Sequence, residues 1–329
     1  MKKQPLTILI RIVIAAMIIL MGMVAYQWHS LPSGEVLVSI PPGSTAVDAA
    51  RLLYESHVIM YPALFVKAVR VLRLSSRLKA GTYEFSPRGS TMPGVLRAVV
   101  SGKTKRIKVT IPEGFTTMQI AQRLQENNII DAAEFSAYIS SRALEGYLLP
   151  DTYFFEFNST PASAARHMET AFQRFMTPER QAAVASLKNM NLAKVVTLAS
   201  IVEKEAAVAH ERAIIAGVFY NRLKKRMPLE SCATVLYALG KHKNRLLYKD
   251  LSVQSPYNTY LHFGLPPGPI CNPGRASLEA VLYPAQTDAL YFVVTGSGTH
   301  SFSRSLSEHA RQKNRLKQIR RANQLNQQK

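Results

Sequence analysis

The sequence is poor in cysteine and tryptophan. Its 329 residues include two cysteines, Cys232 and Cys271, and a single tryptophan. The cysteines are 39 residues apart. They have neither the CxxC spacing nor the companion histidine pair of a zinc site, so we expect no bound metal and no cofactor. They could form a disulfide if the protein is exported, or remain two ordinary buried thiols, and the spacing fits both.

Acidic residues are also scarce. Asp and Glu number 21 against 41 Lys and Arg, which gives a net charge of +20. This excess predicts an acidic partner, and the candidates are nucleic acid, anionic lipid and a carboxylate-rich polymer. Because the chain has no zinc-finger spacing and no RRM-type aromatic run, we expect no nucleic-acid partner. An apolar content of 47% with 19% charged residues is typical of a globular protein, and the length allows two or three domains.

The N-terminal region contains a long apolar run, residues 12–25. Lysine and arginine precede the run, and Tyr26 and Trp28 follow it, as aromatic residues do at a membrane interface. Counted from Leu6, about 20 residues are available, roughly one membrane span. No clean small-x-small cleavage site follows, which favours an anchor over a cleaved signal peptide. We therefore predict a single transmembrane helix within residues 1–30, with a cytoplasmic N-terminus and an exported body.

An internal repeat follows, with an offset of 71 residues. Residues 38–53 (VSIPPGSTAVDAARLL) match residues 109–124 (VTIPEGFTTMQIAQRL), and a second echo joins residues 80–85 to residues 150–155. In each copy a β-branched strand ends at a Pro-x-Gly turn, and a hydroxyl residue then leads into an amphipathic helix. Both copies are therefore predicted to run strand, helix, loop, strand.

Short strand-turn-helix units of this kind resemble the LysM-type modules that bind N-acetylglucosamine polymers. An equally good interpretation is an α+β spacer that holds the next domain away from the membrane. We expect a LysM-like module over residues 31–108, the second copy with a helical connector over residues 109–190, and a further domain over residues 191–329.

Residues 195–212 organise this last domain. Apolar residues recur at i, i+3, i+4 and i+7, which predicts a buried helix, although the pattern leaves open whether residues 192–225 form one helix or two. On the helical wheel Glu205 falls on the apolar face with Val202, Val208 and Ala209, whereas Glu203 is rotated from it by about 200°. A carboxylate on an apolar face is costly unless it is used or satisfied. Glu205 is therefore the candidate catalytic residue, because desolvation would raise its pKa and keep it protonated as a general acid.

Several short blocks follow in a definite order. They are ASIVEKE at 199–205, ER at 211–212, VFYNRL at 218–223, TVLY at 234–237, YNTY at 257–260 and GLPPG at 264–268. In this order they resemble the YceG-like family of endolytic murein transglycosylases, and the likeness extends from the apolar run to His300-x-Phe302. The resemblance implies a bacterial inner-membrane lytic transglycosylase with a periplasmic body. Its substrate would be nascent peptidoglycan strands, cut internally so that elongation ends, and its partners would include peptidoglycan synthases.

The resemblance also implies residue roles. The second glutamate of the Glu-Lys-Glu run is catalytic in the family, and it maps to Glu205, the residue that the periodicity selects. One carboxylate would protonate the oxygen leaving the β-1,4 bond between N-acetylmuramic acid and N-acetylglucosamine. It would then accept the proton of the 6-hydroxyl that attacks C1 and leaves a 1,6-anhydro end. A hydrolase would need a second carboxylate.

We expect polar and aromatic side chains around Glu205 to bind the glycan. They are Glu203, Tyr220, Asn221, Tyr237, Tyr257, Asn258 and Tyr260. Each tyrosine could equally be a core aromatic, Glu203 is better explained as a supporting ion-pair or hydrogen-bond partner, and Asn258 is expected in an exposed loop.

The chain departs from the family pattern at one place. Members usually carry Ser/Thr-Asp-Pro before the Thr-Val-x-Tyr block, whereas this chain has Ser231-Cys232-Ala233. The departure motivates a second interpretation, a membrane-anchored glycan-binding scaffold with lost or weak catalysis. The expected fold is α+β: one transmembrane helix, small LysM-like modules, and a mixed α/β catalytic domain with a buried catalytic helix.

Overall fold

The computed structural model describes residues 34–87, 89–157, 159–240, 246–295 and 298–327, with side chains to residue 318. It contains helices and three two-stranded sheets, so the predicted α+β class is confirmed. The chain divides into two compact units, residues 1–107 with 156–158 and residues 108–155 with 159–329. The predicted transmembrane helix lies outside the described residues. Among those that are described, no helix combines the length and the apolar character needed to cross a membrane.

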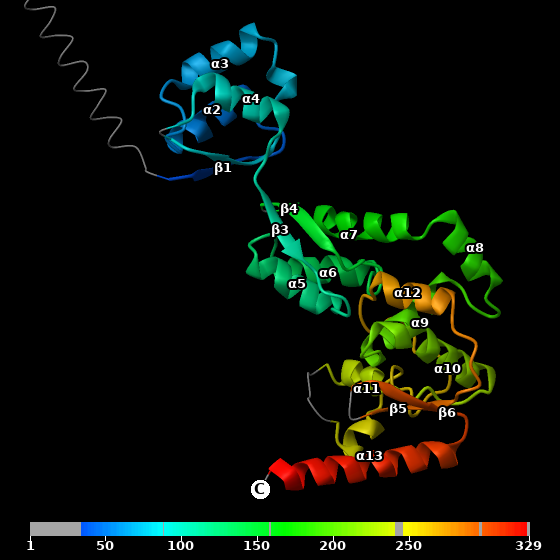
Figure 1. Cartoon of the computed structure of the whole chain (residues 1–329). Coiled ribbons are helices and arrows are strands. Elements are labelled where there is room, and N and C mark those ends of the chain that lie inside the picture. The colour runs from blue at the N-terminus through cyan, green and yellow to red at the C-terminus, as the bar shows by residue number, and fades with distance from the viewer. Residues whose placement is uncertain (1–33, 88, 158, 241–245, 296–297, 328–329) are drawn as a thin grey trace, which may run out of the picture. The chain divides into compact units, whose positions relative to one another are not determined.

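The first unit contains the first repeat copy (blue to cyan in Figure 1). Strand β1 (Val36–Ile40) pairs antiparallel with β2 (Gly81–Phe85), and the register places Val36 opposite Phe85. The helices of the unit are α2 (Ala46–Glu55), α3 (Pro62–Val71), the short 3₁₀ helix η1 (Ser75–Arg77) and α4 (Met92–Ser101). They enclose a core whose largest buried side chains are Tyr83, Phe65 and Leu53.

The second copy has the same order of elements. Strand β3 (Arg106–Thr110) pairs with β4 (Thr152–Glu156), and the helices α5 (Thr117–Glu126) and α6 (Ala132–Ser141) lie between them in the sequence.

The prediction of a loop after the first helix of each copy is wrong, because both copies have a second helix there, α3 and α6. Each of these helices begins with a local start signal. Pro62 is the first residue of α3, and the Asp131 side chain accepts hydrogen bonds from the first turn of α6. Each helix buries one phenylalanine, Phe65 or Phe135, in the core of its copy. These short helices therefore form because a start signal and a buried anchor coincide.

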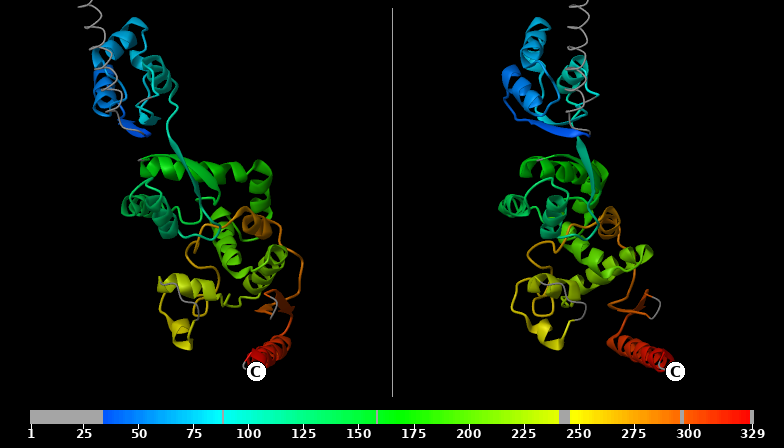
Figure 2. Two further views of the ribbon diagram at one scale, coloured as in Figure 1. Left: turned by 60° about the vertical axis from the view of Figure 1, so that its left-hand side comes forward. Right: turned by 90° about the vertical axis from the view of Figure 1, so that its left-hand side faces the viewer.

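The rest of the second unit is mainly helical. Its elements are α7 (Pro161–Phe175), α8 (Pro178–Ser186), α9 (Leu192–Glu205), η2 (Ala209–Glu211), α10 (Arg212–Lys224), α11 (Cys232–Leu239), η3 (Tyr248–Ser252), α12 (Arg275–Leu282), β5 (Tyr291–Val294), β6 (His300–Ser303) and α13 (Leu306–Gln327). Figures 1 and 2 show α12 lying across α9 and α10, and α13 running beside the hairpin of β5 and β6.

Helix α9 is the centre of this unit. It packs against α8, α10, α11 and α12, and every residue from Val195 to Val202 is buried, so the predicted buried helix is confirmed. The helix ends at Glu205, and the 3₁₀ helix η2 separates it from α10. The chain from 192 to 225 therefore forms two helices, and the tertiary fold, not the periodicity, sets the end of α9.

Candidate active site

Glu205 is the last residue of α9, and its carboxylate lies at the start of α11. The Ser231 hydroxyl donates to Glu205 Oε1 at 2.5 Å, and the backbone N–H of Ala233 donates to the same carboxylate. Ser231 is the N-cap of α11, but its side chain makes no capping bond within its own helix. Because the first N–H groups of a helix lack helical partners, the Glu205 carboxylate satisfies the N-terminus of α11 from outside.

The source of the burial of Glu205 differs from the prediction. The wheel placed it on an apolar face shared with Val208 and Ala209, but both residues follow the end of α9, and Ala209 is exposed. That extended apolar face is therefore wrong. Glu205 is half-buried because two helix ends meet around it.

Burial controls the protonation of Glu205. Loss of solvent raises the pKa of its carboxyl above the ordinary value. The hydrogen bonds from Ser231 and Ala233 and the proximity of His300 and Arg222 act in the opposite direction, and they offset only part of the rise. A carboxyl in this setting holds its proton to higher pH than a free glutamate, as a general acid requires.

Ser231 is held in place by a buried hydroxyl network. Its backbone N–H donates to Thr259 Oγ1 at 3.0 Å, and its carbonyl accepts from Thr234 Oγ1 at 2.7 Å. The two threonine hydroxyls are 2.9 Å apart, and all three residues are buried. The hydroxyl that contacts Glu205 therefore belongs to a segment fixed on both sides.

Arg222 anchors the chain just before Ser231. It lies near the end of α10 with only 6% of its surface exposed. Its Nη1 donates to the carbonyls of Pro228 and Leu229 at 3.1 and 2.9 Å, and its Nε donates to Leu290 O at 2.7 Å. The sequence interpretation missed this role because Arg222 reads as part of the basic run that ends α10. Its burial could have been inferred from the spacing, because Arg222 follows the apolar residues Val218 and Phe219 by four and three positions and so shares their face of the helix.

A buried acid–histidine pair lies close by. Glu211 accepts from the His300 backbone N–H at 2.7 Å, and its other oxygen is 2.6 Å from His300 Nδ1. Burial alone would raise the pKa of Glu211, but the two hydrogen bonds and the charge interactions with His300 and His210 outweigh it and lower that pKa. The pair ties the end of the α9–α10 connection to strand β6.

Glu203 is used in a different way from Glu205. Its side chain is only 7% exposed, accepts from Gly274 N at 2.9 Å and lies 3.7 Å from the Arg212 guanidinium. These contacts join the end of α9 to the starts of α10 and α12. The geometry matches the predicted supporting role and leaves little of the carboxylate open to a substrate.

Three of the predicted glycan-binding side chains donate hydrogen bonds to backbone carbonyls. Tyr220 donates to Val281 O, and Asn221 donates to Thr287 O and Ala289 O. Asn258 is fully buried and donates to Leu251 O and Val253 O, so its predicted exposure is wrong. Loop-rich segments need such side chains to satisfy their buried backbone groups.

The remaining predicted tyrosines are half-buried, and Tyr260 lies close enough to Glu205 to interact with it electrostatically. Tyr237 and Tyr257 have ring centroids 4.9 Å apart and share a hydroxyl hydrogen bond. The Tyr260 hydroxyl is 3.2 Å from Cys232 Sγ, and desolvation, followed by its neighbours Cys232 and Glu205, raises the pKa of that tyrosine. Each of these three tyrosines therefore keeps part of its surface exposed to solvent.

The cysteines are both free thiols, exposed Cys232 and buried Cys271. Cys232 is the first residue of α11, between the two groups that donate to Glu205. Within the described part of the chain, no three His, Cys, Asp or Glu side chains are grouped so that they could hold a metal ion.

The chain is similar to several known proteins along most of its length. Residues 38–315 match the model of the YceG-like family. The chain is 35% identical over 305 residues to an endolytic murein transglycosylase of Bacillus subtilis (strain 168), covering 84% of each protein. It is 30% identical to one from Streptococcus pneumoniae serotype 2 (strain D39 / NCTC 7466), covering 84% of this chain and 59% of that protein. A crystal structure of a YceG-like protein from Listeria monocytogenes aligns with a TM-score of 0.55 and 36% identity, covering 85% of this chain and 99% of that chain.

Proposed function

This chain belongs to the YceG-like family, and we propose that it is an endolytic murein transglycosylase. Its substrate is the β-1,4 bond between N-acetylmuramic acid and N-acetylglucosamine within peptidoglycan strands. The observation that carries the proposal is the placement of Glu205. It is a desolvated carboxyl with a raised pKa, whereas its neighbours Glu203 and Glu211 are engaged by Arg212 and His300.

A single carboxyl can perform both steps of this reaction. Protonated Glu205 donates its proton to the glycosidic oxygen as the bond from that oxygen to C1 breaks. The muramic acid 6-hydroxyl then bonds to C1 and returns its proton to Glu205, which leaves a 1,6-anhydro end and restores the acid. Between the steps Glu205 is charged, and Ser231 and the Ala233 N–H are placed to stabilise that carboxylate. No water is consumed, so no second carboxylate is needed to activate one.

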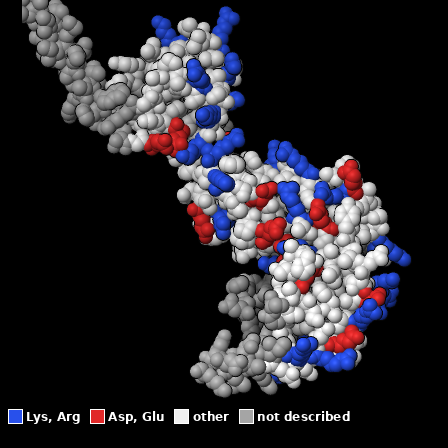
Figure 3. Space-filling view, viewed as in Figure 1, with Lys and Arg blue, Asp and Glu red and all other residues white. Residues whose placement is uncertain are grey.

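The substrate contacts proposed here are the half-buried tyrosines Tyr237, Tyr257 and Tyr260, whose rings can pack on sugar faces. Charge supports an acidic polymer as substrate. The net charge is +20, and Figure 3 shows more basic than acidic side chains over the visible face of the first unit and a mixture of both over the second.

The cellular setting is part of the proposal. The apolar run 12–25, with basic residues before it, supports a single-pass anchor in the bacterial inner membrane with a periplasmic body. The strand and helix order of residues 34–107 supports a LysM-like glycan-binding role for the first unit. Peptidoglycan synthases are proposed as partners because the substrate is a nascent strand.

The scaffold alternative is not favoured. It rests on Cys232 and Ala233, which stand where relatives carry Asp and Pro. In this structure Ser231 and the Ala233 N–H still hold Glu205, so the residues that replace the usual pair leave the acid in place.

The decisive experiment is mass spectrometry of peptidoglycan strands digested by the full chain in detergent. Wild type should release 1,6-anhydro products, and Glu205→Gln should lose about 10²–10⁴-fold in rate, the range for loss of a general acid. Glu279→Gln, an exposed glutamate on α12 that pairs with Arg180, is the matched control and should cut normally. Products with free reducing ends would identify a hydrolase instead, and wild-type binding without turnover would support the scaffold.

The pH dependence of kcat/KM tests the state of Glu205. A general acid works while it is protonated, so the rate should fall as pH rises through the Glu205 pKa. The Ser231 hydroxyl lowers that pKa, and Ser231→Ala should therefore move the alkaline limb of the profile to higher pH. An unmoved limb would show that Glu205 is not the titrating acid.

A further inference from the structure

A groove lies in the second unit beside the segment that carries Ser231. It has a volume of 520 Å³ and is lined by Leu223, Arg226, Met227, Phe263 and Gly264. One wall is the end of α10 with the residues after it, and the other is the loop that follows Tyr260.

Both walls continue directly into the active site. Met227 precedes Ser231 by four residues, a reach of at most about 14 Å for an extended chain. The opposite wall follows Thr259, and the two segments are joined where Glu230 N donates to Thr259 O at 3.1 Å and Ser231 N donates to Thr259 Oγ1 at 3.0 Å. The groove and the Glu205 site therefore lie along the same pair of chain segments.

The groove presents an aromatic ring and a cation to solvent. Phe263 is 73% exposed, far more than a core aromatic. Arg226 is exposed and has no ion-pair partner among the described residues. Among the described residues that line the groove, none is acidic.

The end of α10 fixes the backbone of Arg226. Its φ is +55°, in the left-handed region that a non-glycine residue rarely adopts. Its N–H donates to Leu223 O at 3.2 Å, and Met227 N donates to the carbonyl of buried Arg222 at 2.9 Å. These two hydrogen bonds are those of a Schellman cap at the end of α10, and they fix the backbone from which the Arg226 side chain projects.

We propose that this groove is a subsite for the glycan strand beyond the scissile bond. Phe263 packs on a sugar ring, and Arg226 binds a carboxylate of the peptide stem on that part of the strand. An enzyme that cuts inside a strand must hold polymer beyond the cleaved bond, and the groove supplies the apolar platform and the positive charge that a carboxylate-bearing glycan needs. The inference rests on the proposed function.

The test measures binding by the full chain with Glu205→Gln, which prevents turnover. The two ligands are purified strands that carry peptide stems and the same strands stripped of peptides by an amidase. Arg226→Gln should weaken binding of peptide-bearing strands about tenfold, the loss of one charge-assisted hydrogen bond, and leave binding of stripped strands unchanged. Arg226→Lys should restore part of the affinity.

Phe263→Ala should weaken binding of both ligands about three- to tenfold, because the ring packs on the sugar. Lys225→Gln removes the same charge from the neighbouring exposed position, and Leu261→Ala trims an apolar side chain of the same loop that is 42% exposed. Neither lines the groove, and both should bind as the parent does. All four positions are exposed, so folding is not at risk.

Three results would each overturn the subsite. The first is an equal loss for both ligands in Arg226→Gln, and the second is a matching loss in Lys225→Gln and Arg226→Gln. The third is unchanged binding by Phe263→Ala. Wild-type digestion, measured in parallel, separates the two proposals. If the wild type cleaves the strands but the Arg226→Gln and Phe263→Ala variants bind them normally, the subsite is refuted and the proposed function stands. If the variants show the selective binding losses but the wild type does not cleave, the transglycosylase assignment is refuted and the subsite stands.

Discussion

The two repeat copies share a sequence pattern but have different surroundings. A Cβ atom added to Gly43, in the turn of the first copy, would have no atom of the described residues within 4 Å. In the second copy, a Cβ atom added to Gly114 would lie 3.5 Å from the side chains of Glu203 and Lys204. Lys204 Nζ also donates a hydrogen bond to Gly114 O at 3.1 Å. The turn at Gly43 therefore borders open space, whereas the turn at Gly114 packs on the last residues of α9.

The interiors of the copies do not explain this difference. Each first helix starts with a capping box, Thr45 with Asp48 and Thr116 with Gln119. Each second helix buries its phenylalanine completely. The same local signals therefore build the same structure twice.

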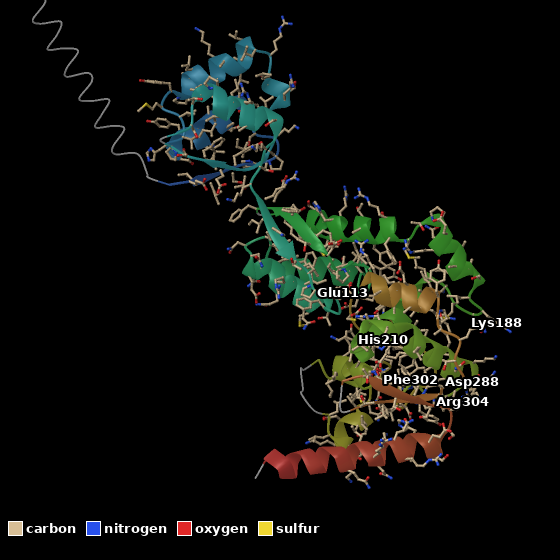
Figure 4. All side chains as sticks on the ribbon, in the orientation of Figure 1. Glu113, Lys188, His210, Asp288, Phe302 and Arg304 are labelled. Atoms are coloured by element: carbon tan, nitrogen blue, oxygen red, sulfur yellow. The ribbon has the colours of Figure 1, made fainter. Side chains whose placement is uncertain are left out.

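Residues outside the repeat make the difference. Buried Asn272, just before α12, accepts from Gly146 N and Leu148 N at 2.9 and 3.0 Å and donates to Phe115 O at 3.0 Å. Glu113 (labelled in Figure 4) lies against Gly274, where an added Cβ would be 2.0 Å from its carboxylate. The second copy is thus built into the second unit, where it packs against the end of the helix that carries Glu205.

The largest expected effect comes from emptying the matched core positions. Phe65→Ala and Phe135→Ala should each cost about 3–5 kcal/mol of unfolding free energy. We expect calorimetry to show Phe65→Ala lowering the transition of the first unit alone, with glycan cleavage intact. Phe135→Ala should lower the transition of the second unit and reduce cleavage. Full cleavage by Phe135→Ala, at a temperature where α6 has lost its protection from hydrogen exchange, would show that cleavage does not depend on the second copy.

A smaller effect is expected at the junction itself. Asn272→Ala leaves the N–H groups of Gly146 and Leu148 without their acceptor, at a cost of about 2–5 kcal/mol in the second unit. Denaturant unfolding should show this loss while the transition of the first unit stays in place. Asn127→Ala, which removes one hydrogen bond at the end of α5, should cost much less. Equal losses in the two variants would mean that Asn272 is not the main connection.

The smallest effect concerns charge at the second turn. Burial, and then the neighbouring Glu203, raise the pKa of Glu113 above 4.5. Its folded form therefore loses stability as pH rises through that pKa. Glu113→Gln should be slightly stabilising at pH 8, by no more than about 0.5 kcal/mol, and neutral at pH 4. Melting temperatures at the two pH values check this prediction, with the exposed Glu126→Gln as the control. A larger gain in melting temperature at pH 4 than at pH 8 would contradict the predicted direction of the Glu113 pKa shift.

Local pattern was sufficient for much of the fold. The repeat and the helix of residues 192–205 were both predictable, because apolar periodicity reports burial directly. The second helix of each copy was missed because it is short and its start signal is weak in isolation.

The site was predictable in part. The sequence alone selected Glu205 as the candidate acid, since its place in an apolar helix and the order of the following blocks point to the same residue. Only the tertiary structure decided what surrounds it. The helix ends at Glu205, and Ser231, Arg222 and Thr259 come from segments up to 54 residues away. Hydrogen bonds between segments so distant leave no periodic trace in a sequence, because each partner's residue type is also common in loops and at helix ends.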